Sequence, residues 1–317
     1  MVGSLGEAIA LQVLQLLFVL ALSPLIKGIL NRWKEFLQGK KGPSIWQVYR
    51  DLRKLWYKER VVPESADWTY RLAPYVYFAA PLIVTMLIPV LTAYPLFMAF
   101  AGDMLAGGFI LGLGTFFLLL GATAGGSPYA GVGATRARFV AMNVEPVLLL
   151  ILFCVSLTAH STIPYVVNKV MAGIFFSPVH LLLLVAFFMV LLAETGRIPV
   201  DNPSSHQEFS MIDANRLYDY SGPDLALLEW GGAMKYIVLG TILMNVLTGP
   251  WGLAPNAGLL SLLIAVATLF GKFLLLNALI VWIESSIGKL RLLRISEYLG
   301  TAGAMALLAV IIQAVAI

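Results

Sequence analysis

The chain has 317 residues, of which 60% are hydrophobic and only 12% are charged, and its mean hydropathy is +0.87. A soluble globular protein covers much of its surface with polar side chains, so this composition excludes that class and indicates an integral membrane protein. The net charge of +4 could suggest a nucleic-acid partner, but the positions of the basic residues favour a membrane topology signal instead. The single cysteine, Cys154, excludes an internal disulfide, and three widely spaced histidines do not form a metal-binding pattern.

Apolar runs long enough to cross a bilayer as helices, about 20 residues each, occur eight times along the chain. They predict one all-α membrane domain over residues 1–317. The first run is too long for a signal-peptide core, so we expect it to be retained as a helix. The predicted spans are approximately 5–30, 72–94, 104–124, 139–160, 175–195, 234–249, 258–284 and 297–317.

Basic residues gather on one side of these spans. Nineteen of the 21 Lys and Arg residues fall in odd-numbered connections, and only Lys169 and Lys272 do not. Because positive residues are retained on the cytoplasmic side, the odd connections are predicted to be cytoplasmic and both termini to lie on the outer side. The predicted location is therefore the inner (cytoplasmic) membrane, crossed several times.

The first connection contains a basic amphipathic segment at residues 40–60. Its apolar residues, from Ile45 to Trp56, follow the three-and-four spacing of one helical face. A basic amphipathic helix with two tryptophans is typical of the membrane interface. It could anchor the fold only, or it could also form the wall of an opening for a ligand or partner.

Residues 194–235 are predicted to form a long acidic cytoplasmic loop. Seven of the 17 acidic residues of the chain lie in this stretch. His206 also lies here, next to Gln207 and Glu208, and could simply be an exposed loop histidine. The acidic residues are Glu194, Asp201, Glu208, Asp213, Asp219, Asp224 and Glu229.

Ionisable side chains inside a bilayer are costly, so each one is a candidate functional residue. Glu145 lies near the predicted start of the fourth span, where the helix dipole alone could account for it. Glu194 ends the fifth span, with Arg197 on the same helical face if the turn continues. Lys272 lies half-way along the seventh span and could merely neutralise one carboxylate, while Glu284 lies at that span's cytoplasmic end.

The remaining polar residues give no catalytic pattern. His160 and His180 fall near the outer ends of two spans, where we expect their polar tips to reach water. No nucleophile, phosphate-binding loop or redox-cofactor motif is present, because the glycine-rich third connection lacks a preceding strand. We therefore expect the chain to perform no chemistry alone.

Two stretches together resemble a known family. The first is Gln38-Gly39-Lys40-Lys41-Gly42-Pro43, followed by Tyr49-Arg50-Asp51-Leu52. The second is Ala193-Glu194-Thr195-Gly196-Arg197 and its continuation to Pro203, then Tyr220-Ser221-Gly222. Both are similar to cytoplasmic loops of the family that contains the membrane protein known as subunit 1 of respiratory complex I, and the resemblance covers nearly the whole chain.

The second stretch also indicates a branch of that family. Complex I members typically carry Asn at the position of Gly196. The Gly-Arg-Ile-Pro-Val-Asp-Asn-Pro sequence instead resembles the membrane subunit of energy-converting nickel-iron hydrogenases and formate hydrogenlyase, of the hydrogenase-4 component C type. The chain departs from that branch at Asp213 and Asn215, so a related complex with another electron acceptor is an open alternative.

The resemblance implies a subunit that connects a soluble redox arm to antiporter-like proton-pump subunits in the membrane. It implies no cofactor on this chain, and it places a nickel-iron site and iron-sulfur clusters on the hydrogenase-like large and small subunits. The implied proton relay is Glu145, Glu194, Arg197, Lys272 and Glu284. The implied coupling-loop residues that face the redox partner are Asp201, His206, Glu208, Asp213, Asp219 and Glu229. The implied docking residues are Arg50, Asp51, Lys54, Arg136, Arg138, Arg291 and Arg294.

Two other functions compete with this one. A quinone-reductase subunit of the same family would use the acidic loop to line a quinone chamber. A stand-alone secondary transporter would use the intramembrane charges to bind a substrate. The absence of an internal repeat and of paired broken helices argues against the transporter.

Overall fold

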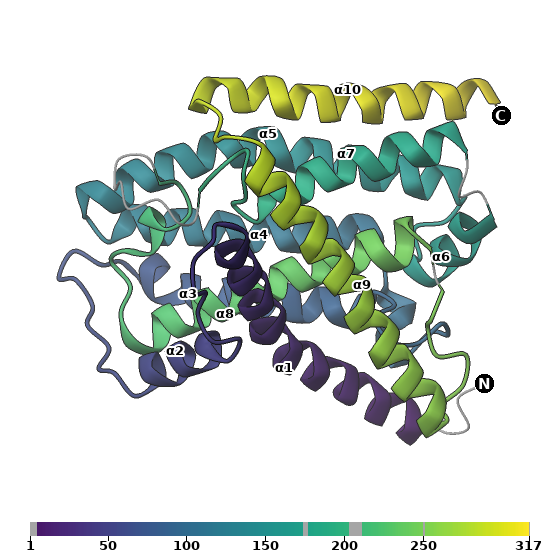
Figure 1. Cartoon of the computed structure of the whole chain (residues 1–317), viewed down its shortest axis with the longest axis horizontal. Helices are drawn as coiled ribbons and strands as arrows, with labels where there is room; N and C mark the ends of the chain where they lie inside the picture. The colour runs from purple at the N-terminus through teal and green to yellow at the C-terminus, as the bar shows by residue number, and fades with distance from the viewer. Residues whose placement is uncertain (1–4, 174–176, 203–210, 250, 317) are drawn as a thin grey trace.

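The computed structural model describes residues 5–173, 177–202, 211–249 and 251–316, which fold into helices without a strand (Figure 1). The α-helices are α1 (Leu5–Leu37), α2 (Gln47–Trp56), α3 (Trp68–Leu87), α4 (Met104–Ala124), α5 (Pro128–Thr158), α6 (Pro164–Gly173), α7 (Pro178–Glu194), α8 (Gly222–Thr241), α9 (Leu259–Ser286) and α10 (Leu292–Ala316). Short 3₁₀ helices lie at η1 (Phe97–Ala101) and η2 (Asn215–Leu217), and α8 continues into the π-helix η3 (Ile242–Leu247).

Each of the eight predicted spans coincides with a helix. Seven of the described helices are long and apolar enough to cross a membrane: α1, α3, α4, α5, α8 with η3, α9 and α10. The eighth, α7, is equally apolar but has only 17 residues. The predicted all-α membrane fold is confirmed.

Helix α8 is the centre of the bundle. It is the most buried of the seven long helices and packs against α3, α1 and α2. Helix α10 packs on α7 and α5 along one side (Figure 1). The start of α1 and the end of α10 lie at one end of the bundle, whereas α2 and the described residues between α7 and α8 lie at the opposite end, which we call the loop end (Figure 1). Which end faces the cytoplasm stays a prediction.

Two predicted boundaries are wrong. The sixth span begins at Gly222 rather than near residue 234, so the second half of the predicted acidic loop is helix. Pro223 lies in the first turn of α8, where proline is favourable, and the charged residues that suggest a loop, Glu229 and Lys235, have ion partners within the protein. The fourth span begins at Pro128 rather than 139, because Arg136 and Arg138 hide an otherwise helical stretch from a hydropathy count.

Helix α2 occupies the middle of the segment at residues 40–60. Its apolar face packs against α8 and α1, and Leu52 is its buried residue. Trp46, just before the helix, and Trp56, at its end, are each more than half exposed. The location of this helix at a membrane interface stays a prediction.

Candidate functional site

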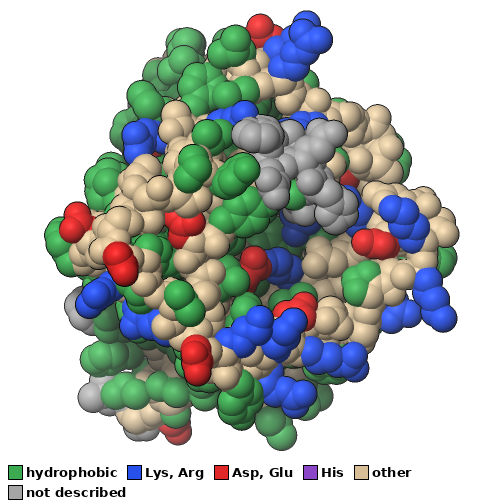
Figure 2. Space-filling model, turned by 90° about the vertical axis from the view of Figure 1, so that its left-hand side faces the viewer, with side chains coloured by type: hydrophobic (Ala, Val, Ile, Leu, Met, Phe, Trp, Pro, Cys, Tyr) green, Lys and Arg blue, Asp and Glu red, His purple; other side chains and the backbone are tan. Residues whose placement is uncertain are grey.

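A cavity of about 490 Å³ opens at the loop end, and we call it the chamber. Residues of α1, α7 and α8 and of the segment between α7 and α8 line it. Figure 2 shows this face of the molecule hollowed, with acidic and basic side chains inside the hollow. The charged residues that line the chamber are Lys27, Lys34, Glu35, Glu194, Arg197, Asp201, Asp213, Arg216, Glu229 and Lys235.

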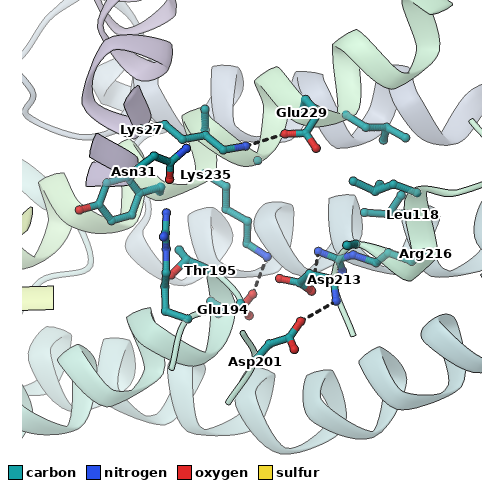
Figure 3. A pocket seen from close by; sticks show the side chains of 18 of the residues that line it. Lys27, Asn31, Leu118, Glu194, Thr195, Asp201, Asp213, Arg216, Glu229 and Lys235 are labelled. Atoms are coloured by element: carbon teal, nitrogen blue, oxygen red, sulfur yellow. Dashed lines mark hydrogen bonds and ion pairs between the residues drawn. The ribbon is translucent and has the colours of Figure 1, made fainter. Parts of the chain in front are cut away.

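The C-terminal end of α7 fixes the position of Glu194. The Gly196 N–H donates to Ala193 O and the Arg197 N–H donates to Leu192 O, while Gly196 has a φ of +59°. This is the Schellman arrangement, which ends a helix at a glycine. Glu194 is therefore held at the last turn, and its Oε2 lies 2.5 Å from the Lys235 Nζ on α8 (Figure 3).

The Glu194–Lys235 pair is buried between helices. The side chain of Glu194 is 8% exposed and that of Lys235 is 5% exposed. The Lys235 ammonium also donates to the Thr115 hydroxyl on α4 at 2.8 Å. A buried ion pair with a further hydrogen bond can hold or release a proton only as a unit, because removing either charge leaves the other uncompensated.

Arg197 does not share a helical face with Glu194. The expected (i, i+3) pair fails because α7 ends at Glu194 and the glycine turn sends the next residues away. Arg197 instead lies 3.7 Å from Glu284 at the end of α9, and Lys34 of α1 lies 3.1 Å from the same carboxylate. Arg197 and Glu284 are thus brought together, with Arg197 at the wall of the chamber.

Asp201 organises the segment that follows α7. Its Oδ2 accepts from the backbone N–H groups of Ile212 and Asp213, at 3.0 and 2.9 Å, and its Oδ1 pairs with Lys289 at 2.7 Å. The residue is 2% exposed. Its oxygens are occupied within the chain, so the geometry favours a role in holding the loop over direct contact with a partner.

A second cavity of about 470 Å³ is a groove between α4 and α5, and we call it the lateral groove. Exposed Phe109 and Phe116 lie at its sides, while Glu145 of α5 and Glu194 line it. Glu145 lies mid-helix, 17 residues after Pro128, so the dipole at the helix start does not account for it.

Glu194 lines three cavities. It lines the chamber, the lateral groove and a narrow extension of about 20 Å³ that also touches Thr115, Asp213 and Lys235. A side chain in this position can exchange protons with both the chamber and the groove.

The other acidic residues of the predicted loop have separate surroundings. Glu229, on α8, pairs with Lys27 at 2.6 Å and lines the chamber. Asp224, in the first turn of α8, pairs with Arg60 at 2.6 Å. Asp219 is partly buried beside Gly125 and lines none of the three cavities. His206 and Glu208 lie outside the described residues.

Lys272 has different contact partners from the other predicted relay residues. It is 2% exposed and donates to Asn245 Oδ1 at 2.9 Å and to Gly249 O at 3.2 Å. Its ammonium lies 4.6 Å from the centre of the Trp251 ring. Lys272 lines none of the three cavities, and it forms no ion pair with a carboxylate in the described part of the chain.

Most of the predicted docking residues lie on the surface. Arg50, Asp51, Lys54, Arg138, Arg291 and Arg294 are exposed, and Arg136 is half-buried.

His160 is exposed in the turn after α5, as expected. His180 is only 1% exposed, so the expectation that it reaches water is wrong. It lies in the first turn of α7, which is covered by neighbouring helices.

Sequence reasoning misses the cations of the site. Lys27, Lys34 and Lys235 stand out in the sequence only as topology markers, although each pairs with a carboxylate at a chamber wall. Arg216 pairs with Asp213 at 3.0 Å and is 8% exposed. The sequence signal that could identify these cations is a charged residue within a long apolar segment, since Lys27 and Lys235 both lie inside membrane-length helices.

Comparison with known proteins gives a consistent assignment. A sequence model of the family described as NADH dehydrogenase matches residues 9–315. The chain is 32% identical to hydrogenase-4 component C of Escherichia coli K12, over 92% of this chain and 91% of that protein. It is 30% identical to formate hydrogenlyase subunit 4 of the same organism, over 88% of this chain and 90% of that protein.

A solved structure shares the fold. A chain of the membrane-bound sulfane sulfur reductase, an archaeal respiratory membrane complex, superimposes with a TM-score of 0.82, at 21% identity and over 96% of this chain and 99% of that chain. The family match spans nearly every residue, and the relatives match over almost their full length. The chain belongs to the NADH dehydrogenase family.

Proposed function

We propose that the chain is the membrane-anchoring and ion-coupling subunit of a multi-subunit, energy-converting nickel-iron hydrogenase or formate hydrogenlyase-like complex. In this role it links a soluble redox arm, docked at the loop end, to antiporter-like proton-pump subunits beside it in the membrane. The relatives named hydrogenase-4 component C and formate hydrogenlyase subunit 4 support the complex type. The charged chamber supports a coupling role over a purely anchoring one.

One observation carries this proposal: Glu194 lines both the chamber and the lateral groove. Proton transfer needs groups that can gain and lose a proton along a continuous path. Glu194 with Lys235 provides such a group between the loop end and the side of the bundle, and Glu145 provides the next carboxylate in the groove. This route accounts for the buried charges without a separate substrate.

The orientation and docking surfaces follow from the same proposal. The loop end faces the cytoplasm, in the inner membrane, and both termini lie on the outer side, as the basic residues predict. The hydrogenase-like large and small subunits cover the chamber and contact the exposed basic residues of α2 and of the α9–α10 connection. The pump subunits lie along the lateral groove, where exposed Phe109 and Phe116 offer an apolar surface.

We place the nickel-iron site and iron-sulfur clusters on those partner subunits. In the part of the chain that the structure describes, no three His, Cys, Asp or Glu side chains are grouped so that they could hold a metal ion. The chain's own residues contribute binding, charge and proton transfer.

A quinone-reductase subunit is the second candidate, and the size of the chamber favours it. A volume near 490 Å³ lies within the range of small-molecule sites, roughly 300–1,000 Å³. Five basic and five acidic side chains line the cavity, which favours water and ions over an apolar quinone tail. Copurification of the native complex distinguishes the two, because the first predicts hydrogenase-like subunits and the second a quinone.

The proposed function is tested with Glu194→Gln in the whole complex. The amide keeps the shape of the side chain but cannot carry a proton. Because the buried Lys235 loses its carboxylate, we expect a lower yield of assembled complex. The complex that assembles should transfer electrons but move fewer ions per electron. Glu297→Gln, at an exposed position on α10 outside all three cavities, is the matched control. An unchanged ratio of ions to electrons in Glu194→Gln would refute the relay.

A further inference from the structure

Asp213 occupies a position between the chamber and the Glu194–Lys235 pair. It lines the chamber and also the narrow extension that contains Glu194, Lys235 and Thr115. Its carboxylate pairs with Arg216 at 3.0 Å, and its backbone N–H donates to Asp201 Oδ2. Figure 3 shows the Asp213 and Glu194 side chains in the same part of the cavity.

Gly196 provides the space that the Asp213 carboxylate fills. A Cβ atom at residue 196 would lie 1.7 Å from Asp213 Oδ2 and 2.6 Å from its Cγ, so no other residue fits there without displacing the carboxylate. The same glycine has a φ of +59° and closes the Schellman turn after Glu194. The Asp213 carboxylate therefore packs against Gly196, which lies two residues beyond Glu194 at the end of α7.

Asp213 is much more open to the chamber than the pair behind it. Its side chain is 35% exposed, compared with 8% for Glu194 and 5% for Lys235. A proton from the chamber therefore reaches Asp213 more readily than it reaches Glu194.

The charges around Asp213 suit a group that gains and loses a proton. Burial within the protein raises the pKa of the Asp213 carboxyl above its ordinary value, and Arg216 opposes this shift. Asp201 and Glu194 raise this pKa further, while Lys235 lowers it. Arg216 is 8% exposed, and a guanidinium keeps its charge in proteins, so Arg216 is a permanent cation beside the carboxyl.

We propose that Asp213 is the proton-transfer group between the chamber and the Glu194–Lys235 pair, and that Gly196 and Arg216 hold its carboxylate in place. A proton from water in the chamber adds to an Asp213 oxygen. The same proton then moves to the Glu194 carboxylate, and Asp213 returns to its ionised form. This inference rests on the proposed function, because it supplies the entry point of that relay.

The test is Asp213→Asn in the whole complex, with ion movement and electron transfer measured across pH. In the parent complex, ion movement falls as pH rises through the Asp213 pKa, because less of the carboxyl carries a proton. In Asp213→Asn we expect ion movement about 10²-fold slower or more, the loss typical of removing a proton-transfer group, with that pH dependence absent. Added acetic acid, a small diffusible proton donor, should restore much of the rate.

Glu297→Gln is again the control, since Glu297 is exposed on α10 and lines none of the three cavities. It should move ions at the parental rate. A structural role for Asp213 would slow both electron transfer and ion movement, and acetic acid would not restore either.

Gly196→Ala tests the same point without removing a charge. The added methyl group displaces the Asp213 carboxylate, so we expect slow ion movement in an assembled complex, although Asp213 and Arg216 are both present. Parental ion movement at every pH in an assembled Asp213→Asn or Gly196→Ala complex would overturn the inference. If Glu194→Gln is slow while Asp213→Asn is normal, only the entry point is refuted; normal ion movement in Glu194→Gln refutes the relay itself.

Discussion

The buried cations of this protein have two kinds of surroundings. At the loop end, Lys235, Arg216 and Lys34 each lie within about 3 Å of a carboxylate, and all three line the chamber. Lys272 is equally buried, but its contacts are an amide oxygen, a backbone carbonyl and an indole ring. It lies twelve residues before Glu284 on α9, about 18 Å along the helix axis.

We propose that this difference separates a charge that takes part in proton movement from one that stabilises the fold. A lysine paired with a carboxylate beside a cavity can exchange protons, because both partners titrate and water is close. Beside Arg216, which stays charged, only the carboxylate titrates. Lys272 instead directs its three donors at neutral groups. Its partner Asn245 donates to the carbonyls of Pro89 and Val90, both at 3.0 Å, and so ties the π-helix η3 to the chain that follows α3. Burial alone does not identify a relay residue.

The largest effect should come from Lys235→Met, which breaks the ion pair at the loop end. The change leaves the Glu194 carboxylate buried without a cation, and losing one partner of a buried pair costs about 3–5 kcal/mol. We expect a sharp drop in the yield and thermal stability of the complex, and no coupled ion movement in what assembles. Lys169→Met, at an exposed position on α6, is the control. Parental stability in Lys235→Met would show that the pair is not held as the structure has it.

Glu145→Gln should have an intermediate effect. Glu145 is half-buried in the lateral groove and forms no ion pair with a described residue, so the neutral amide leaves no partner uncompensated. We therefore expect normal assembly and electron transfer, with ion movement reduced by about 10²-fold, the lower end of the loss typical of removing one proton-transfer group. The measurement is the ratio of ions moved to electrons transferred in reconstituted complex. An unchanged ratio would confine the relay to the chamber.

The sequence predicts the helices well because bilayer-length apolar runs are a strong signal. It fails where polar residues pair inside the protein. The start of α8 and the first turns of α5 resemble loops because their charged residues lower the hydropathy, although Glu229 and Lys235 are neutralised by Lys27 and Glu194. A linear sequence does not show such pairs, and Lys27 and Glu229 are 202 positions apart.

The candidate site is predicted in part for the same reason. Glu145 and Glu194 are found because carboxylates in apolar segments are rare, and the structure brings both to the lateral groove. Their cation, Lys235, is missed, and the predicted partner Arg197 belongs to Glu284. That error comes from extending a helix through Gly196, where a positive φ ends it. The fit of Asp213 against Gly196 depends on contact between segments and has no sequence signal.

The smallest effect on ion movement should come from Lys272→Met, which makes the same substitution as Lys235→Met in the other kind of surroundings. No buried carboxylate loses its cation, so the main penalty is that Asn245 Oδ1 loses its donor, at about 1–3 kcal/mol. We expect a modestly lower melting temperature and an unchanged ratio of ions to electrons. The two lysines thus make a matched pair measured under one assay. If Lys272→Met assembles normally but moves fewer ions, Lys272 takes part in the relay, as the sequence alone predicts. In that case, the lack of a carboxylate partner does not exclude a buried cation from the relay.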